Sequence, residues 1–243
     1  MDMTRDFIEK LQEMDKPNEI DYSGRKFVDK EMSVLPQETL AQPLKTSTLT
    51  SIVDYITSGT DSAALPANSK FVIHISGYGT VDLYQELNSD KRRNHLIHAC
   101  AEECGFRFGQ FMPLEDFNIN VQSLFKQDDN TAALLKFIGN VKIDSGVQQE
   151  DDGVTQKITA NRGISLGISK EVPNPITLKP YRTFTEIEQP ESTFVFRLQK
   201  DDRLGVTAAL FEADGAAWKH KAIQSIKDYL TENLKDQQVI ILA

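Results

Sequence analysis

Apolar positions near the N-terminus recur with the spacing of one helical face. Within residues 4–15, four side chains share that face: Phe7, Ile8, Leu11 and Met14. Polar residues occupy the remaining positions, and the polar, turn-prone segment 16–33 follows. The pattern predicts an amphipathic helix on a polar tether, with a stripe that must be buried against its own domain or against a neighbouring molecule.

The next part of the chain predicts one helix and one hairpin. Within residues 37–59, Thr48 is suited to be the N-cap of a helix that ends at Ser58 and Gly59. Alternating apolar residues in 71–75 and 80–84 flank a glycine-containing turn and predict a β-hairpin. Residues 94–100 fit a strand and a short helix equally well.

Helical spacing returns in the middle of the chain. A helical face begins after Pro113 and extends to residue 125. Asn130 is expected to cap a second helix, which ends at Gly139 and Asn140.

From residue 141 the spacing changes to that of short strands. Five alternating runs follow, at residues 141–148, 153–159, 176–181, 193–199 and 204–211. Asp214 is expected to cap a last helix, and a β-prone run over 237–242 ends the chain. This order predicts an α+β fold with a mainly antiparallel sheet. We expect residues 1–33 to form an arm and 34–243 a single domain.

The composition excludes several classes of protein. The chain has 243 residues, with 27 Lys and Arg against 36 Asp and Glu, hence a net charge of −9. A field of this sign repels phosphate backbones, so nucleic-acid binding is not expected. Two cysteines cannot form a disulfide framework, and we find neither a secretory signal nor an apolar run long enough for a bilayer. We expect a soluble cytoplasmic protein that does not bind membranes.

One cluster has the residue types of a zinc site: His95, His98, Cys100 and Cys104. On a helix the histidines and the cysteines lie on opposite sides, and on a regular strand His95 and His98 point to opposite faces. We therefore expect buried core cysteines and ordinary histidines, with no metal ion and no other cofactor.

A second string matches a hydrolase motif. Gly163-Ile164-Ser165-Leu166-Gly167 has the form of a nucleophile elbow, and Asp201, Asp214 and His220 follow in the order of the α/β-hydrolases. The elbow requires a helix directly after the serine, but Pro173 and Pro175 disfavour one there. We expect no catalytic residues and no enzymatic activity.

Two further features carry hypotheses of binding. Lys91, Arg92 and Arg93 form the one compact basic group and could contact an anion. The uncharged C-terminal run Val239, Ile240, Ile241 and Leu242 would be prone to aggregate if it were free. We expect it to add a strand to a sheet of its own chain or of another subunit. Together with Phe7, Ile8, Leu11 and Met14, it is the predicted self-assembly interface.

Several stretches follow one ordered pattern. They are residues 108–111 with Glu115 and Asp116, residues 130–143, the proline-bounded segment 172–180, the strand pair 193–211 and the closing helix. This pattern resembles the YfdQ-like family of uncharacterised phage and prophage proteins. The resemblance covers about residues 45–236 and implies a phage-encoded protein of the host cytoplasm without assigned catalytic residues. Our first hypothesis is a non-enzymatic, self-assembling accessory protein. The alternative is a phage early protein that sequesters a host factor or a small anionic ligand near Lys91, Arg92 and Arg93.

Overall fold

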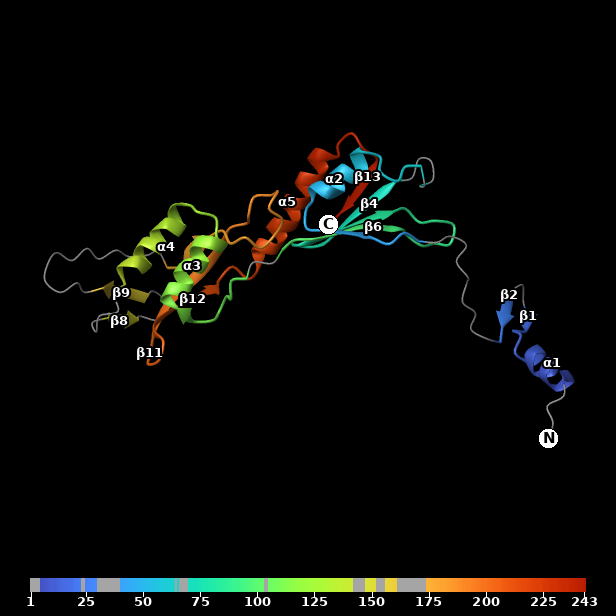
Figure 1. Cartoon of the computed structure of the whole chain (residues 1–243), viewed down its shortest axis with the longest axis horizontal. Coiled ribbons are helices and arrows are strands. Elements are labelled where there is room, and N and C mark those ends of the chain that lie inside the picture. Colours follow the sequence, from blue (N-terminus) through green and yellow to red (C-terminus); the bar gives the residue numbers. More distant parts are fainter. Residues whose placement is uncertain are drawn as a thin grey trace. The chain divides into compact units, whose positions relative to one another are not determined.

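The chain divides into two compact units, residues 1–39 and 40–243. The computed structural model describes residues 5–22, 25–29, 40–63, 65, 70–102, 105–141, 147–151, 156–160 and 174–243 (Figure 1). In these ranges the fold is mixed α+β, and most strand pairs of its two larger sheets, taken together, are antiparallel, which confirms the predicted fold class. The predicted boundary at residues 33 and 34 lies outside the described residues.

The first unit contains the predicted helix and a hairpin. Its elements are α1 (Arg5–Met14), β1 (Glu19–Tyr22) and β2 (Arg25–Val28). β1 and β2 pair antiparallel, so part of the polar segment 16–33, predicted as a tether, forms a hairpin that the sequence pattern did not predict. Asn18 closes this hairpin, because its backbone N–H and its side-chain amide donate to the two carboxylate oxygens of Asp29 at 2.8 and 2.7 Å.

The second unit contains the remaining helices and strands. They are β3 (Leu44–Thr46), α2 (Thr50–Thr57), β4 (Phe71–Gly77), β5 (Thr80–Gln85), β6 (His95–Cys100), β7 (Met112–Pro113), α3 (Leu114–Leu124), α4 (Asp129–Asn140), β8 (Val147–Asp151), β9 (Gln156–Ala160), β10 (Ile176–Leu178), β11 (Ser192–Asp201), β12 (Gly205–Glu212), α5 (Ala217–Asn233) and β13 (Val239–Leu242).

A five-stranded sheet has the strand order β13-β4-β5-β6-β3. β4 and β5 form the predicted hairpin. The segment 94–100, which the sequence left undecided, is strand β6 because it pairs antiparallel with β5. β13 and β3 are the two edges, and each runs parallel to its neighbour. The C-terminal run thus joins a sheet of its own chain.

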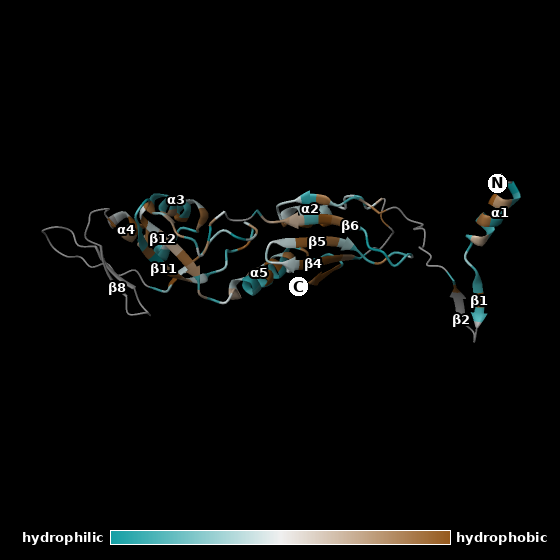
Figure 2. Cartoon of the chain, turned by 90° about the horizontal axis from the view of Figure 1, so that it is seen from below, coloured by the Kyte–Doolittle hydropathy of each residue, from teal (hydrophilic) through white to brown (hydrophobic). Residues whose placement is uncertain are grey.

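One face of this sheet carries the first hydrophobic core. Ile73 of β4 and Leu83 of β5 are fully buried against Ile52 of α2 and Ile226 of α5. The hydrophobic residues of these strands are visible in Figure 2. α2 and α5 lie on the same side of the sheet, and within residues 40–243 no described helix lies over the other side (Figure 1). We call this other side the open face.

The second core lies between a four-stranded sheet and two helices. The sheet has the order β10-β11-β12-β7, and α3 and α4 pack on it. Aromatic rings fill much of this core, including the fully buried Phe117 and Phe194. β8 and β9 form a separate antiparallel pair. β11 and β12 confirm the strand pair that the sequence predicted.

Three predicted N-caps were wrong: Thr48, Asn130 and Asp214. The caps observed are Leu49 for α2, Asp128 for α4 and Ala216 for α5. In each case the helix begins one or two residues away from the predicted start, so a neighbouring residue is the N-cap. Sequence preferences for a cap are therefore more reliable for the existence of a helix than for its first residue.

The displaced polar residues still make specific contacts. Asn130 lies in the first turn of α4. Its side-chain amide donates to the carbonyl oxygen of Thr177 at 3.0 Å, which connects the helix to β10. Asp214 Oδ1 accepts from the backbone N–H of Ala216 at 3.1 Å, and its Oδ2 accepts from the Ser192 hydroxyl at 2.7 Å.

Candidate functional site

A row of side chains crosses the open face from one edge of the sheet to the other. The register places Leu242 beside His74, His74 beside Asp82, Asp82 beside His98, and His98 beside Lys45. Directly opposed residues on neighbouring strands point to the same side of a sheet. Two histidines and an aspartate are therefore adjacent on this face.

The closest contacts in this region are made by Asp82. Its Oδ1 lies 2.7 Å from Nδ1 of His98 and 3.0 Å from Nε2 of His95. These three atoms, each of a type that can bind a metal ion, all lie within 4.8 Å of one another. Asp82 is only 8% exposed, whereas both histidines are partly exposed. We call Asp82, His95 and His98 the Asp–His cluster.

A β-bulge brings His95 and His98 to the same side. Leu83 pairs with Ile97, but the next residue, Tyr84, pairs with His95, so that Leu96 is an extra residue on β6. Such an insertion reverses the alternation of side chains on one side of it. The expectation that the two histidines point to opposite faces was therefore wrong.

Of the two cysteines, the structure describes only Cys100, which does not belong to the Asp–His cluster. Cys100 is exposed, so the prediction that it is a buried core thiol was also wrong. Its Sγ lies 3.8 Å from the carbonyl oxygen of Ala101, and Cys104 lies outside the described residues. Asp82, which was not among the predicted residues, lies beside the two histidines. It is 13 residues from His95, and only the pairing of β5 with β6 brings the two together.

Tyr84 supports the Asp–His cluster from one side. Its ring stacks on the His95 imidazole, with centroids 4.6 Å apart and an angle of 26° between the planes. Burial and, secondarily, the negative charge of Asp82 raise the pKa of the Tyr84 hydroxyl, so it stays protonated at neutral pH. The stacking restricts rotation of the imidazole and keeps Nε2 directed at the carboxylate.

The predicted self-assembly residues occupy two separate elements. Phe7, Ile8, Leu11 and Met14 form the stripe of α1 and are all exposed, from 43% for Ile8 to 70% for Met14. On β13, Val239 and Ile241 pack against the first core, whereas Ile240 and Leu242 are 49% and 50% exposed. Half of the apolar side chains of β13 are therefore used within the chain.

The predicted anion-binding residues lie in a tight turn between β5 and β6. The side chain of Asn88 accepts from the backbone N–H groups of Asp90 and Arg92, which holds the turn. Lys91 has a positive φ of 58° and, like Arg93, is exposed. Anion binding by this turn stays a prediction.

Among the described residues of the predicted hydrolase motif, Asp201, Asp214 and His220 make no hydrogen bond or ion pair with one another and lie at different places in the fold. Ser165 lies outside the described residues. Asp201 Oδ1 accepts from the backbone N–H groups of Arg203 and Leu204 in the turn between β11 and β12. Asp214 binds Ala216 and Ser192 as described above, and His220 is exposed on α5.

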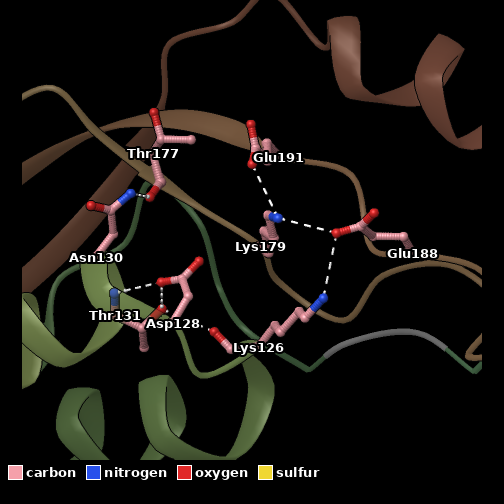
Figure 3. Close-up of polar contacts among 8 residues, drawn as sticks. All are labelled: Lys126, Asp128, Asn130, Thr131, Thr177, Lys179, Glu188 and Glu191. Atoms are coloured by element: carbon pink, nitrogen blue, oxygen red, sulfur yellow. Dashed lines mark hydrogen bonds and ion pairs between the residues drawn. The ribbon is translucent and has the colours of Figure 1, made fainter.

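A second polar group surrounds Lys179 (Figure 3). Its ammonium lies 3.1 Å from a carboxylate oxygen of Glu191 and 3.2 Å from one of Glu188, and Glu188 also contacts Lys126 at 3.4 Å. Hydrogen bonds to Glu191 and then Glu188 raise the pKa of Lys179, and bonds to Lys179 and Lys126 lower the pKa of Glu188. Each charge here is balanced by a neighbour, as in a structural ion-pair network.

Comparisons of the chain with protein-family models, with curated proteins and with solved structures return no match. The resemblance to the YfdQ-like family therefore stays a prediction. Among the described residues, none of the helices combines the length and the apolar composition needed to span a bilayer.

Proposed function

We propose that the chain is a non-enzymatic accessory protein of phage type whose copies associate through the edge strand β13, with the stripe of α1 as a second contact. The observation that carries the proposal is the chemistry of β13. It is a sheet edge, its four residues are Val, Ile, Ile and Leu, and no charged side chain occurs from Gln237 to the last residue.

An edge of this kind offers unpaired backbone groups to another strand. Natural edges are usually protected by charged side chains, proline or a covering segment. β13 has no charge and no proline, and Ile240 and Leu242 remain half exposed beside the backbone. The same strand of a second copy, placed antiparallel across a two-fold axis, would continue the sheet and cover these side chains.

The α1 stripe supports the same conclusion independently. A helix of ten residues is marginally stable by itself in water, so an exposed apolar face is usually stabilised by a partner surface. The four stripe residues lie on one face, and the other face is charged, with an Arg5–Glu9 ion pair at 2.9 Å. A second copy of the chain would supply an apolar surface of the same kind.

The test is the native mass of the full chain in solution, measured by light scattering at micromolar concentration. We expect a multiple of 27.4 kDa. Ile240→Lys should reduce the mass, because it adds charge to a half-exposed edge position without removing a core side chain. Ile119→Lys is the matched control, since Ile119 is 56% exposed on α3, and it should leave the mass unchanged.

The contribution of α1 is tested with a second pair of variants. Leu11→Lys places a charge in the stripe, whereas Gln12→Lys adds the same charge at an exposed position of the same helix outside the stripe. A wild-type particle of 27.4 kDa would refute self-association. An oligomer whose mass both Ile240→Lys and Leu11→Lys leave unchanged would refute the proposed interfaces.

A further inference from the structure

The donor atoms of the Asp–His cluster have the spacing of ligands around a single ion. Zinc lies about 2.0–2.2 Å from imidazole nitrogens and carboxylate oxygens, so neighbouring ligand atoms of a tetrahedral site are separated by roughly 3.4 Å. Asp82 Oδ1 is 3.0 Å from His95 Nε2 and 2.7 Å from His98 Nδ1. Two of the three separations are therefore within about 0.7 Å of the value for a tetrahedral ion.

Two imidazole nitrogens from one strand point at the same carboxylate oxygen. His95 Nε2 also lies 3.1 Å from the carbonyl oxygen of Ile97. The second ring, directed at the same oxygen, brings all three ligand atoms within 4.8 Å of one another.

The cluster is also held in place before any ion binds. Tyr84 stacks on His95, the two imidazoles meet edge to face with centroids 6.0 Å apart, and Asp82 is almost fully buried. The bulge at Leu96 sets the directions of both histidines. Ligands held in place by neighbouring groups lose less conformational freedom when an ion binds.

We propose that Asp82, His95 and His98 bind a divalent transition-metal ion of the Zn²⁺ type on the open face of the five-stranded sheet. Two imidazoles and one carboxylate suit zinc, iron, cobalt or nickel, whereas Mg²⁺ and Ca²⁺ prefer oxygen ligands only. The ion is bound by neutral imidazoles and an ionised carboxylate. The net charge of −9 favours the approach of a cation.

Three protein ligands leave at least one coordination position for water or for a group from another molecule. That position faces solvent, on the same side of the sheet as the half-exposed Leu242. The site is complete within one chain, so it does not depend on the self-association proposed above.

The first experiment is a calorimetric titration of the full, untagged chain with Zn²⁺. We expect one equivalent to bind. His95→Ala and His98→Ala should each weaken the affinity for Zn²⁺ more than roughly tenfold. Changing a residue that only supports a metal ligand already costs about that much, and these two residues are ligands themselves. His220→Ala is the matched control, because His220 is exposed on α5, away from the open face, and it should bind like the wild type.

A second experiment needs no variant and thus cannot fail through misfolding. The chain has four histidines, so nuclear magnetic resonance can follow all their ring nitrogens. One equivalent of Zn²⁺ should shift Nε2 of His95 and Nδ1 of His98 most, and leave His220 unchanged. One equivalent of Mg²⁺ should shift none of them.

The proposal is overturned if equimolar Zn²⁺ shifts no ring nitrogen, or shifts all four histidines equally, as non-specific binding would. Equal affinity of His95→Ala, His98→Ala and the wild type would overturn it as well. None of these outcomes depends on the mass of the particle, so the metal site and self-association can fail separately.

Discussion

At the scale of single residues, the N-terminus of α2 is stabilised by a side chain from a distant part of the chain. Glu186 Oε1 accepts from the backbone N–H groups of Leu49 and Thr50 at 2.7 and 3.2 Å. It also accepts from the Thr50 hydroxyl at 3.3 Å. A carboxylate at this end satisfies unpaired amides and interacts favourably with the helix dipole. Thr48, the local candidate, instead contacts the Ser51 hydroxyl at 2.6 Å.

Replacing Glu186 by alanine should therefore destabilise the fold although no residue of α2 changes. We expect a loss of about 1 kcal/mol, the typical effect of removing a helix cap. Chemical denaturation measures it. Glu232→Ala, an exposed position near the end of α5, is the control and should change the stability less. Equal stability of the two variants would show that Glu186 is not the cap.

At the scale of elements, the turn between β11 and β12 shows how one side chain can define a hairpin. Asp201 Oδ1 accepts from the N–H groups of Arg203 and Leu204, both at 2.8 Å. Gly205 then pairs with Asp201 and has a φ of +74°, a conformation that side chains other than glycine rarely adopt. The bonds from Leu204 and Arg203 lower the pKa of the Asp201 carboxyl below its ordinary value.

This lowered pKa predicts a pH-dependent contribution to stability. The ionised carboxylate is favoured in the folded state, so its contribution is present above the ordinary pKa of 3.8 and is lost as the pH falls through the lower folded value. Asp201→Ala should be less stable than the wild type at neutral pH, and the difference should shrink at a pH below 3.8. Urea denaturation at both pH values checks this.

Asp202→Ala is the matched control for the turn, because Asp202 is the adjacent exposed aspartate. Its effect on stability should be small and should change little between the two pH values. If Asp201→Ala and Asp202→Ala showed the same pH dependence, the hydrogen bonds of Asp201 would not be the cause.

At the scale of the second unit, a buried arginine links α5 to the second core. The guanidinium of Arg182 lies 3.6 Å above the Trp218 ring of α5, and 5.6 and 5.7 Å from Phe108 and Phe194 of the second core. It also donates hydrogen bonds to Glu212 and to the Ser192 hydroxyl. A planar cation with donors at its edge can stack and form hydrogen bonds simultaneously.

Arg182→Ala should strongly destabilise the second unit, because it leaves a cavity among the rings and removes the charge that partners Glu212. We expect a loss of about 3 kcal/mol. Arg182→Lys should restore little of it, since an ammonium cannot reproduce the stacking and the paired hydrogen bonds. Thermal and chemical unfolding measure both, with the exposed Arg203→Ala as the control. A small effect of Arg182→Ala would refute this role.

The helices and strands that could be predicted are those whose apolar residues recur periodically within one short segment. The stripe of α1, the β4–β5 hairpin and the β11–β12 pair each have an apolar periodicity within one short segment. The β1–β2 hairpin was missed because its two strands have only four residues each, and polar side chains dominate the segment around them.

The sequence by itself determined the α+β class, the order of most elements and the apolar character of both ends, because hydrophobic spacing reports which side of a helix or strand is buried. Only the tertiary structure decided that 94–100 is a strand, that Glu186 caps α2 and that Asp82 meets His95 and His98. These depend on pairing between distant segments and on a single bulge, and neither leaves a periodic trace in the sequence.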